Sequence, residues 1–320
     1  ADRRDADTWN HCLNERLDTL PVNVLQVTSD EAKALIRHAE ICLGAHHSPD
    51  LFHVQHETVK ATSFALANQV NQAEKQLEKV WQQRESLRGL LAACTDSCPQ
   101  SDYRRQLEQA LAEADAAVAG AEQQVQDRRD RRQRAAEARQ GLSQTYHPFD
   151  QQSGLPQDAH AVVDGLGKHF DQLDQVADEA SLSQAVRDRL AKARRVTERM
   201  QATIDFFWTT VLVWFDKWQL PSPVARLMRE VLIPACYLRG AADKASLAAE
   251  RKRLRKLADE VEARARSPDS VWWSLDAADQ EELLERARRC AELFQRSSSC
   301  VEGRNGHLAL KHHALHQLSV

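Results

Sequence analysis

Glycine and proline are scarce in this chain, with 10 and 9 residues among 320. A protein of many β-strands needs these residues at its turns, so their scarcity argues against a β-rich fold. Hydrophobic residues make up 42% of the sequence and charged residues 28%. This balance is sufficient for a buried core and argues against disorder of the whole chain. We therefore expect a mainly helical protein of about two domains.

Long hydrophobic runs are absent as well. The aromatic and aliphatic stretch from Ile204 to Phe215 is much shorter than the roughly 20 residues that a membrane-spanning helix requires. No signal peptide is recognisable, and the first residue is Ala rather than Met. The seven cysteines are an odd number scattered along the chain, which is not the pattern of a disulfide framework. These features predict a cytoplasmic protein without membrane association.

An excess of positive charge is also lacking, because the formal net charge is −4. Any contact with nucleic acid must therefore come from local basic patches. The basic run 128–134 is interleaved with acidic residues, so a solvated helix face is its default interpretation. The run 251–256 is a stronger candidate, with Arg251, Lys252 and Arg253 as potential DNA contacts. The sequence has neither of the glycine-rich nucleotide-binding motifs nor a serine-hydrolase motif, so no small-molecule cofactor is expected.

The first sixty residues have an α/β pattern. A β-branched run at 22–27 predicts a strand, and the apolar spacing of 32–43 predicts a helix that Gly44 closes. The short apolar stretch 51–54 then predicts a second strand. Strand, helix and strand in this order are typical of an α/β segment.

From about residue 61 the hydrophobic spacing changes to alternating steps of four and three, the heptad pattern of a coiled coil. A turn signal at 95–102 interrupts the pattern, which predicts an antiparallel helical hairpin over 62–142. Because the second seam becomes rich in arginine after Val125, we expect that end of the hairpin to be splayed or solvated. The first seam comprises Leu66, Val70, Ala73, Leu77, Val80, Arg84, Leu87 and Leu91. The second comprises Leu107, Leu111, Ala114, Val118, Ala121, Val125, Arg128 and Arg132.

The segment 146–157 contains two prolines and a glycine, which predicts a linker. A helical bundle is expected over 158–297. Its helices carry apolar residues at 182–200, 247–265 and 283–294, and prolines at 221, 223 and 268 mark breaks between them.

Four residues are candidates for chemistry. Asp30 follows the predicted strand, where α/β folds place ligands and metals, although Asp is also a common helix N-cap. Glu302 stands in a Ser-x-x-Glu spacing that fits a capping box, but two glycines follow it at once and disfavour a simple capped helix. Asp50 and His53 form an Asp-x-x-His pair that either binds a metal or orients a reacting group, or is an ordinary hydrogen-bonded pair.

Two segments together resemble DDE-type transposases of bacterial insertion sequences. The first covers 28–35 and 48–53, with Thr28-Ser29-Asp30 and Ser48-Pro49-Asp50-Leu51-Phe52-His53. The second covers 298–313, with Val301-Glu302-Gly303-Arg304-Asn305-Gly306 followed by a pair of histidines. In such enzymes a ribonuclease H-like domain is interrupted by a large all-helical insertion between the second and third acidic residues.

The resemblance implies a fold and a site. The partial ribonuclease H-like core would comprise 1–60 and 298–320, and the all-helical insertion 61–297. Asp30 would be the second catalytic aspartate and Glu302 the catalytic glutamate, both binding Mg²⁺ or Mn²⁺ in a two-metal site, with Asp50 and His53 as an accessory motif. The expected partners are transposon-end DNA and further copies of the chain in a synaptic complex associated with the bacterial nucleoid. Arg304, Asn305 and Lys311 would join the basic run at 251–253 in DNA binding.

One feature of the family is missing from this sequence. The first catalytic aspartate of the family lies on an opening strand, whereas Asp2, Asp5 and Asp7 stand in a polar stretch without a strand pattern. We therefore expect a fragment that begins after those strands and is catalytically incomplete alone.

Two further hypotheses remain open: a scaffold protein built on the helical hairpin, and a helical DNA-binding module without catalysis. The distance between the Asp30 and Glu302 carboxylates distinguishes them from the enzyme, because bridging by metal ions requires roughly 8 Å or less.

Overall fold

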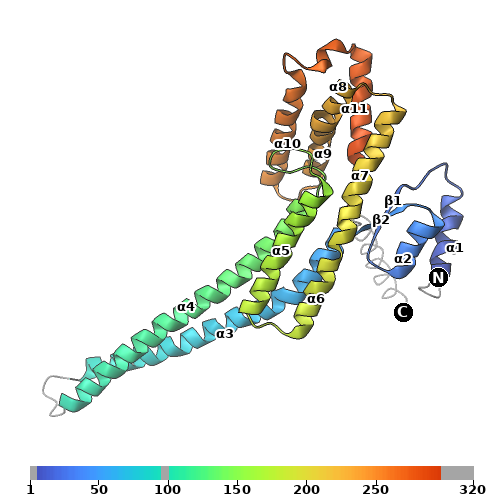
Figure 1. The fold of residues 1–320 in the computed structure, drawn as a ribbon. Coiled ribbons are helices and arrows are strands. Elements are labelled where there is room, and N and C mark those ends of the chain that lie inside the picture. The colour runs from blue at the N-terminus through green and yellow to red at the C-terminus, as the bar shows by residue number, and fades with distance from the viewer. Residues whose placement is uncertain (1–5, 95–100, 297–320) are drawn as a thin grey trace, which may run out of the picture. The chain divides into compact units, whose positions relative to one another are not determined.

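The computed structural model describes residues 6–94 and 101–296 of the chain, which are mostly helical (Figure 1). The strands are β1 (Gln26–Ser29) and β2 (His46–Pro49). The longer helices are α1 (Ala6–Leu17), α3 (Leu51–Ala93), α4 (Ser101–Thr145), α5 (Ala159–Glu179), α6 (Gln184–Arg195), α7 (Thr197–Lys217), α9 (Ile233–Lys244), α10 (Ala248–Ala263) and α11 (Ala277–Glu292). The short helical segments are α2 (Lys33–Arg37), η1 (His38–Cys42), α8 (Ser222–Leu227), η2 (Met228–Leu232), η3 (Arg264–Arg266) and η4 (Val271–Ser274).

The chain forms two compact units. Unit 1 contains the described residues of 1–55, 141–168 and 194–320, and unit 2 contains those of 56–140 and 169–193. This division places residues 141–168 and 194–297 of the expected insertion in the same unit as the strands. The domain boundaries at 60 and 297 therefore stay a prediction.

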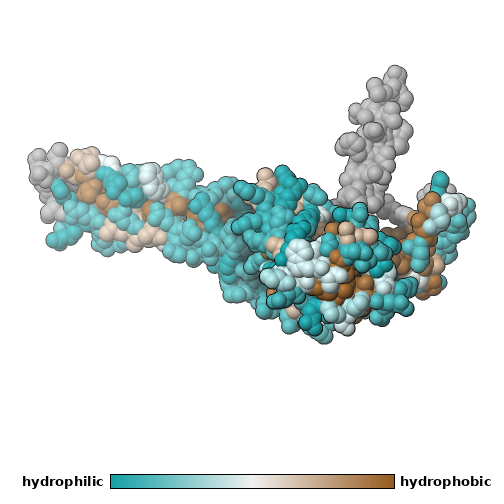
Figure 2. All heavy atoms as spheres, turned by 90° about the horizontal axis from the view of Figure 1, so that it is seen from above, coloured by the Kyte–Doolittle hydropathy of each residue, from teal (hydrophilic) through white to brown (hydrophobic). Residues whose placement is uncertain are grey.

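Unit 2 contains the predicted helical hairpin. Arg84 of α3 pairs with Asp115 of α4 at 2.6 Å, and Glu74 pairs with Arg129 at 2.5 Å. The partner number rises along α4 as the number falls along α3, so the two helices run antiparallel. Figure 2 shows hydrophobic residues as an interrupted line along a largely hydrophilic hairpin. The buried apolar residues of α3 and α4 include Leu66, Val70, Ala73, Leu107, Ala114, Val118, Ala121, Val125, Ala135 and Ala138.

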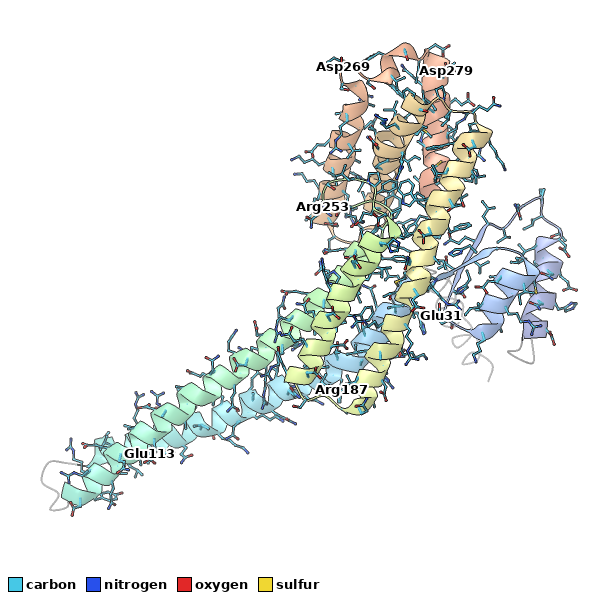
Figure 3. The ribbon with its side chains drawn as sticks, in the orientation of Figure 1. Glu31, Glu113, Arg187, Arg253, Asp269 and Asp279 are labelled. Atoms are coloured by element: carbon cyan, nitrogen blue, oxygen red, sulfur yellow. The ribbon has the colours of Figure 1, made fainter. Side chains whose placement is uncertain are left out.

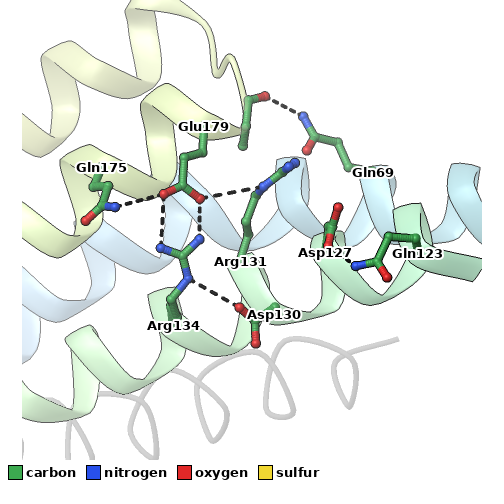
Figure 4. Close-up of polar contacts among 9 residues, drawn as sticks. Gln69, Gln123, Asp127, Asp130, Arg131, Arg134, Gln175 and Glu179 are labelled. Atoms are coloured by element: carbon green, nitrogen blue, oxygen red, sulfur yellow. Dashed lines mark hydrogen bonds and ion pairs between the residues drawn. The ribbon is translucent and has the colours of Figure 1, made fainter.

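The arginine-rich end of the hairpin is packed, which corrects the prediction that it is splayed or solvated. Ala135 and Ala138 have no exposed surface. Arg131 and Arg134 of α4 both pair with Glu179 of α5, and Gln175 donates a hydrogen bond to the same carboxylate (Figure 4). The arginines therefore attach α5 to the hairpin, and the hydrogen bond from Arg134 is the main cause that lowers the pKa of Glu179.

The strands of unit 1 form a two-stranded parallel sheet, but neither lies where the apolar pattern predicted it. The predicted strand 22–27 begins only at Gln26, and Val22 is 59% exposed. The predicted strand 51–54 is the first turn of α3, because Leu51 and Val54 are spaced to share the buried face of a helix. Gly44 has φ +60°, which confirms that it closes the preceding helical segment.

The core of unit 1 is aromatic and includes the segment predicted as a linker. Tyr146 and Phe149 of this segment have no exposed surface. The Phe149 ring lies 5.4 Å from that of Trp208 and 5.3 Å from that of Tyr237, within the range of favourable aromatic pairs. The segment 146–157 connects α4 to α5, as predicted, but it is a core element rather than an exposed linker.

The bundle helices predicted from 247–265 and 283–294 are confirmed as α10 and α11. Helix α9 packs against α10 through Leu238, Leu254, Ala258 and Val261. Among the described residues, no helix is long and apolar enough to span a bilayer.

Candidate functional site at the ends of the parallel strands

Both strands of the sheet are followed directly by an aspartate. Ser29, the last residue of β1, is paired with Pro49, the last residue of β2, and the Asp50 amide donates a hydrogen bond to the Ser29 carbonyl at 3.0 Å. Because the strands are parallel, Asp30 and Asp50 lie at the same edge of the sheet. This is the edge at which open α/β sheets place ligands.

Asp30 is exposed, and its Oδ1 accepts a hydrogen bond from the Ala32 amide at 3.3 Å. The alternative that Asp30 is an N-cap is wrong in detail. Helix α2 begins at Lys33, its N-cap residue is Ala32, and no side chain caps it. The carboxylate instead stabilises the turn that leaves the strand.

Asp50 is buried, with 2% of its surface exposed, and its Oδ1 accepts a hydrogen bond from the Phe52 amide at 2.9 Å. An acidic side chain at the start of a long helix satisfies an amide that the helix leaves unpaired and interacts favourably with the helix dipole. His53 lies in the first turn of α3 and is partly buried. The structure thus places the Asp-x-x-His pair on one helix start beside the sheet.

Arg199 of α7 adds a positive charge at this edge, which the sequence did not indicate. Its Nε lies 3.5 Å from Oε2 of Glu31, and its Nη1 lies 3.9 Å from Oε1 of Glu40. Glu31 follows Asp30 on the segment that leads to α2 (Figure 3). Burial raises the pKa of Glu31, and the Arg199 guanidinium opposes that rise. Within the described part of the chain, Oε1 of Glu31 is buried without a hydrogen-bond partner.

His47 connects Arg199 to the strand. Arg199 Nη1 donates to His47 Nδ1 at 3.4 Å, and His47 Nε2 lies 2.9 Å from the Ser29 hydroxyl. That hydroxyl donates to the Asp30 carbonyl at 2.9 Å, so its oxygen accepts from the imidazole. The network therefore selects the neutral tautomer with its proton on Nε2. Burial, followed by the Arg199 charge, lowers the pKa of His47 to about 4.

His46, the neighbour of His47 on β2, also contacts α7. Its Nε2 lies 3.0 Å from the Thr203 hydroxyl, and its ring stacks on Phe206 at 4.5 Å. Burial also lowers the pKa of His46 to about 4. The two histidines are therefore neutral near pH 7, and in this form both connect β2 to α7.

The chain returns to this sheet after the helical bundle. The Gln26 side chain donates to the Gln295 carbonyl at 2.8 Å, and the Ser48 hydroxyl donates to the same carbonyl at 3.2 Å. The Leu51 amide, directly after Asp50, donates to the Arg296 carbonyl at 2.9 Å. The Arg296 side chain in turn donates to the Ser143 carbonyl at 2.7 Å. These bonds hold residues 295 and 296 across both strands.

The other predicted residues of the C-terminal motif, Glu302, Arg304, Asn305 and Lys311, lie outside the described residues. Within 6–94 and 101–296, no group of three or more His, Cys, Asp or Glu side chains is arranged to hold a metal ion. Asp30 is thus the one predicted metal ligand that the structure describes, and the distance from Asp30 to Glu302 stays untested.

The basic run on α10 is largely engaged within the chain. Arg251 donates to the Ala245 carbonyl at 2.8 Å, and Arg253 pairs with Glu250 at 2.6 Å and donates to the Gln151 carbonyl (Figure 3). Lys252 is exposed. These bonds engage the guanidinium groups of both arginines within the chain. The two arginines are therefore less available to contact DNA phosphates.

Sequence reasoning missed Glu31, His47 and Arg199. Glu31 directly follows Asp30, and His47 directly precedes Ser48, so the available signal is a polar side chain adjoining each motif segment. Arg199 stands in an amphipathic helix without a local signal, and only the fold brings it to the strands.

Comparison with known proteins found one family. Residues 228–320 match DUF6399, which is described as a family of unknown function. No curated protein matches the chain. No solved structure matches it either. The matched segment covers less than a third of the chain and carries no activity with it.

Proposed function

We propose that this chain is part of a DDE-type transposase that cuts and joins DNA with divalent metal ions. Asp30 and Glu302 are the proposed catalytic carboxylates and metal ligands, with Mg²⁺ or Mn²⁺ as the metal. Support comes from two parallel strands that are each followed directly by an aspartate, with a helical segment between them. A long helical excursion then begins immediately after Asp50. This order is what the resemblance implies for a ribonuclease H-like core with an insertion.

The observation that carries the proposal is the hydrogen bond from the Leu51 amide to the Arg296 carbonyl. This bond places the end of the long helical segment, at Arg296, beside Leu51, the residue at which that segment begins. Glu302 lies six positions after Arg296, and an extended chain of that length spans at most about 20 Å. Convergence of Glu302 with Asp30 is therefore compatible with the chain connection, although the two are about 270 positions apart in sequence.

The proposed reaction needs carboxylates at this edge. A water oxygen attacks the phosphorus of a DNA phosphodiester, the bond to the 3′ oxygen breaks, and that oxygen leaves as a hydroxyl after taking up a proton. The hydroxyl then attacks a second phosphodiester and releases another 3′ hydroxyl, so the number of bonds is conserved. Two divalent ions would activate the attacking oxygen and stabilise the leaving one. Oxygen ligands such as Asp30 and Glu302 suit Mg²⁺ and Mn²⁺. Arg199, the cation near Asp30, is already paired with Glu31 and Glu40, so the metal ions would have to supply most of the positive charge that a phosphate needs there.

One observation favours a scaffold or a non-catalytic DNA-binding module instead. Asp30 and Asp50 each accept a hydrogen bond from a backbone amide two residues ahead. Such bonds stabilise turns and helix starts without any metal, so the two carboxylates have a structural role in either hypothesis.

A nicking assay separates the hypotheses. A supercoiled plasmid that carries the transposon end is incubated with Mg²⁺ or Mn²⁺ and the protein, expressed both as this chain and with the coding sequence that precedes it. Metal-dependent nicking that Glu302→Gln and Asp30→Asn abolish, and that Glu292→Gln and Asp18→Asn preserve, is the expected result. The two control residues are exposed carboxylates on or beside helices. Nicking that survives Glu302→Gln, or its absence from the extended protein, refutes the assignment.

A further inference from the structure

The outer half of the helical hairpin comprises residues 71–93 of α3 and 101–127 of α4. The rest of unit 2 attaches at the base of the hairpin, where Gln69 donates a hydrogen bond to the Ala180 carbonyl at 2.8 Å and Arg131 pairs with Glu179. Figures 1 and 2 show no further described helix of unit 2 beside the outer half. This segment is therefore two helices thick, with a broad face on each side.

The apolar seam is less completely buried in the outer half than at the base. Leu66 and Val70, at the base, are 1% and 3% exposed. Leu77, Val80 and Leu87, farther out on α3, are only partly buried. Two helices alone thus leave apolar surface in contact with water, and burial of that surface favours packing against further helices.

One face of the outer half is charged. Glu74 of α3 pairs with Arg129 of α4 at 2.5 Å, which places both residues on this face. Residues seven positions apart share a face of a coiled-coil helix. The charged face therefore also contains Trp81 and Arg88 of α3, and Glu108, Asp115 and Glu122 of α4. Charges at these positions are typical of a two-stranded coiled coil whose flanks are in water.

The opposite face carries no charge. Because Glu74 and Arg129 meet on one side of the seam, the residues that flank the seam on its other side meet on the opposite face. We call this the neutral face, and it consists of Gln76, Gln83 and Leu90 of α3 with Tyr103, Ala110, Ala117 and Gln124 of α4. Leu90 is 50% exposed and Tyr103 43% exposed.

The difference between the two faces indicates that one of them is covered in solution. The positions beside the seam of a water-exposed helix pair are commonly charged, as they are on the charged face. Helices that pack against further helices instead extend their uncharged stripe to one side of the seam. The neutral face has this second pattern, so we expect helices to pack on it.

A second copy of the hairpin fits the neutral face. Two copies related by a twofold axis present the same surface to each other, and a surface without charge meets itself without like-charge repulsion and without burying an ion. The face is about 30 Å long from Tyr103 to Gln124 and two helices, or about 20 Å, wide. Two copies would bury about 1,200 Å² in total, which is at the lower end of stable interfaces.

We propose that two copies of this chain pair through the neutral faces of their hairpins and form a four-helix bundle there. The resemblance to transposases implies further copies in a complex but assigns no surface that joins them. The family match, to residues 228–320, does not include the hairpin. The inference uses the hairpin alone and does not depend on the proposed function.

Sedimentation velocity of the nuclease-treated 320-residue chain over a concentration series tests the proposal. The wild type should shift from monomer to dimer as the concentration rises. Ala117→Glu and Leu90→Glu each place a carboxylate on the neutral face and should weaken the dimer about tenfold or more. Because the interface holds no ion pair, added salt should not weaken the wild-type dimer.

Ala116→Glu is the matched control. It introduces the same side chain one position earlier on α4, off both faces that flank the seam, and Ala116 and Ala117 are both exposed. This variant should dimerise like the wild type. Ala117→Glu alone keeps the test valid if Leu90→Glu disturbs the packing of the two helices, and circular dichroism of each variant checks that.

A wild type that is monomeric at every concentration overturns the proposal. A dimer that Ala117→Glu and Ala116→Glu affect equally, or one that added salt dissociates, overturns it as well. A dimer that depends on Ala117, without metal-dependent nicking, keeps the neutral face and refutes the transposase assignment. Nicking that depends on Glu302, with a chain that stays monomeric, does the reverse.

Discussion

Acidification should destabilise unit 1 through His47, whose neutral form the strand network requires. The residue is 4% exposed, accepts a hydrogen bond from Arg199 and donates one to Ser29. Its pKa falls from 6.5 to about 4 on folding. The unfolded chain therefore takes up the proton more readily than the folded one. The contribution of His47 to stability is complete above pH 6.5 and is lost as the pH falls towards 4.

The size of this loss follows from the two pKa values. The pKa of His47 is 6.5 in the unfolded state and about 4 in the folded state. Lowering the pH from 7 to 5 therefore reduces the free energy of unfolding by about 2 kcal/mol. His46 has a similarly lowered pKa, so the wild-type loss is larger than this. A comparison with a variant isolates the share of His47.

The variant is His47→Gln, and exposed His160→Gln is the control. Urea unfolding at pH 7 and pH 5 is followed by tryptophan fluorescence, which reports mainly unit 1 because six of the seven tryptophans belong to it. His47→Gln should be less stable at pH 7 because it loses native contacts, yet it should lose about 2 kcal/mol less than wild type between the two pH values. His160→Gln should follow the wild type. Equal losses in all three proteins would refute the reasoning.

Two further predictions concern the core of unit 1. Gly154→Ala should destabilise the protein by more than about 1 kcal/mol, because Gly154 has φ +71° and an added Cβ would lie 2.5 Å from Cγ2 of Val261. Gly240→Ala, in a helix with open space around it, should be neutral or stabilising by up to about 1 kcal/mol, and thermal unfolding of the pair checks the contrast. Phe149→Ala should cost about 3–5 kcal/mol in urea unfolding, since the ring is fully buried, whereas Phe64→Ala, 77% exposed, should change stability by less than about 0.5 kcal/mol. Similar costs for the two phenylalanine variants would contradict the assigned core.

The helical hairpin could be predicted because its signal is local and repeated. Steps of four and three along 66–91 and 107–125 place one apolar stripe on each helix, and an interruption with a proline leaves an antiparallel pair as the simplest arrangement. The observed pairs Arg84–Asp115 and Glu74–Arg129 confirm it. Its arginine-rich end could not be predicted in the same way, because the compensating Glu179 lies on another helix some 45 residues away.

The strands illustrate the opposite case. Strand β2 consists of His46, His47, Ser48 and Pro49, which carry no apolar alternation, so its register depends on β1 and on contacts with α7. The apolar residues that follow it, 51–54, predict a strand by composition, although their spacing also suits the first turn of a helix. Periodicity alone does not separate a short strand from a helical turn.

For this protein, local sequence determined the features that neighbouring residues encode. These are the mainly helical composition, the two seams of the hairpin, the bundle helices α10 and α11, and an aspartate after the first strand. Tertiary structure alone decided what depends on distant partners. It paired the polar strand β2 with β1, buried Tyr146 in a core, and returned Arg296 to Leu51 across some 245 residues. The physical reason is that a stripe of side chains is encoded by neighbours a few residues apart. A hydrogen bond between remote segments is encoded only by the packing that brings them together.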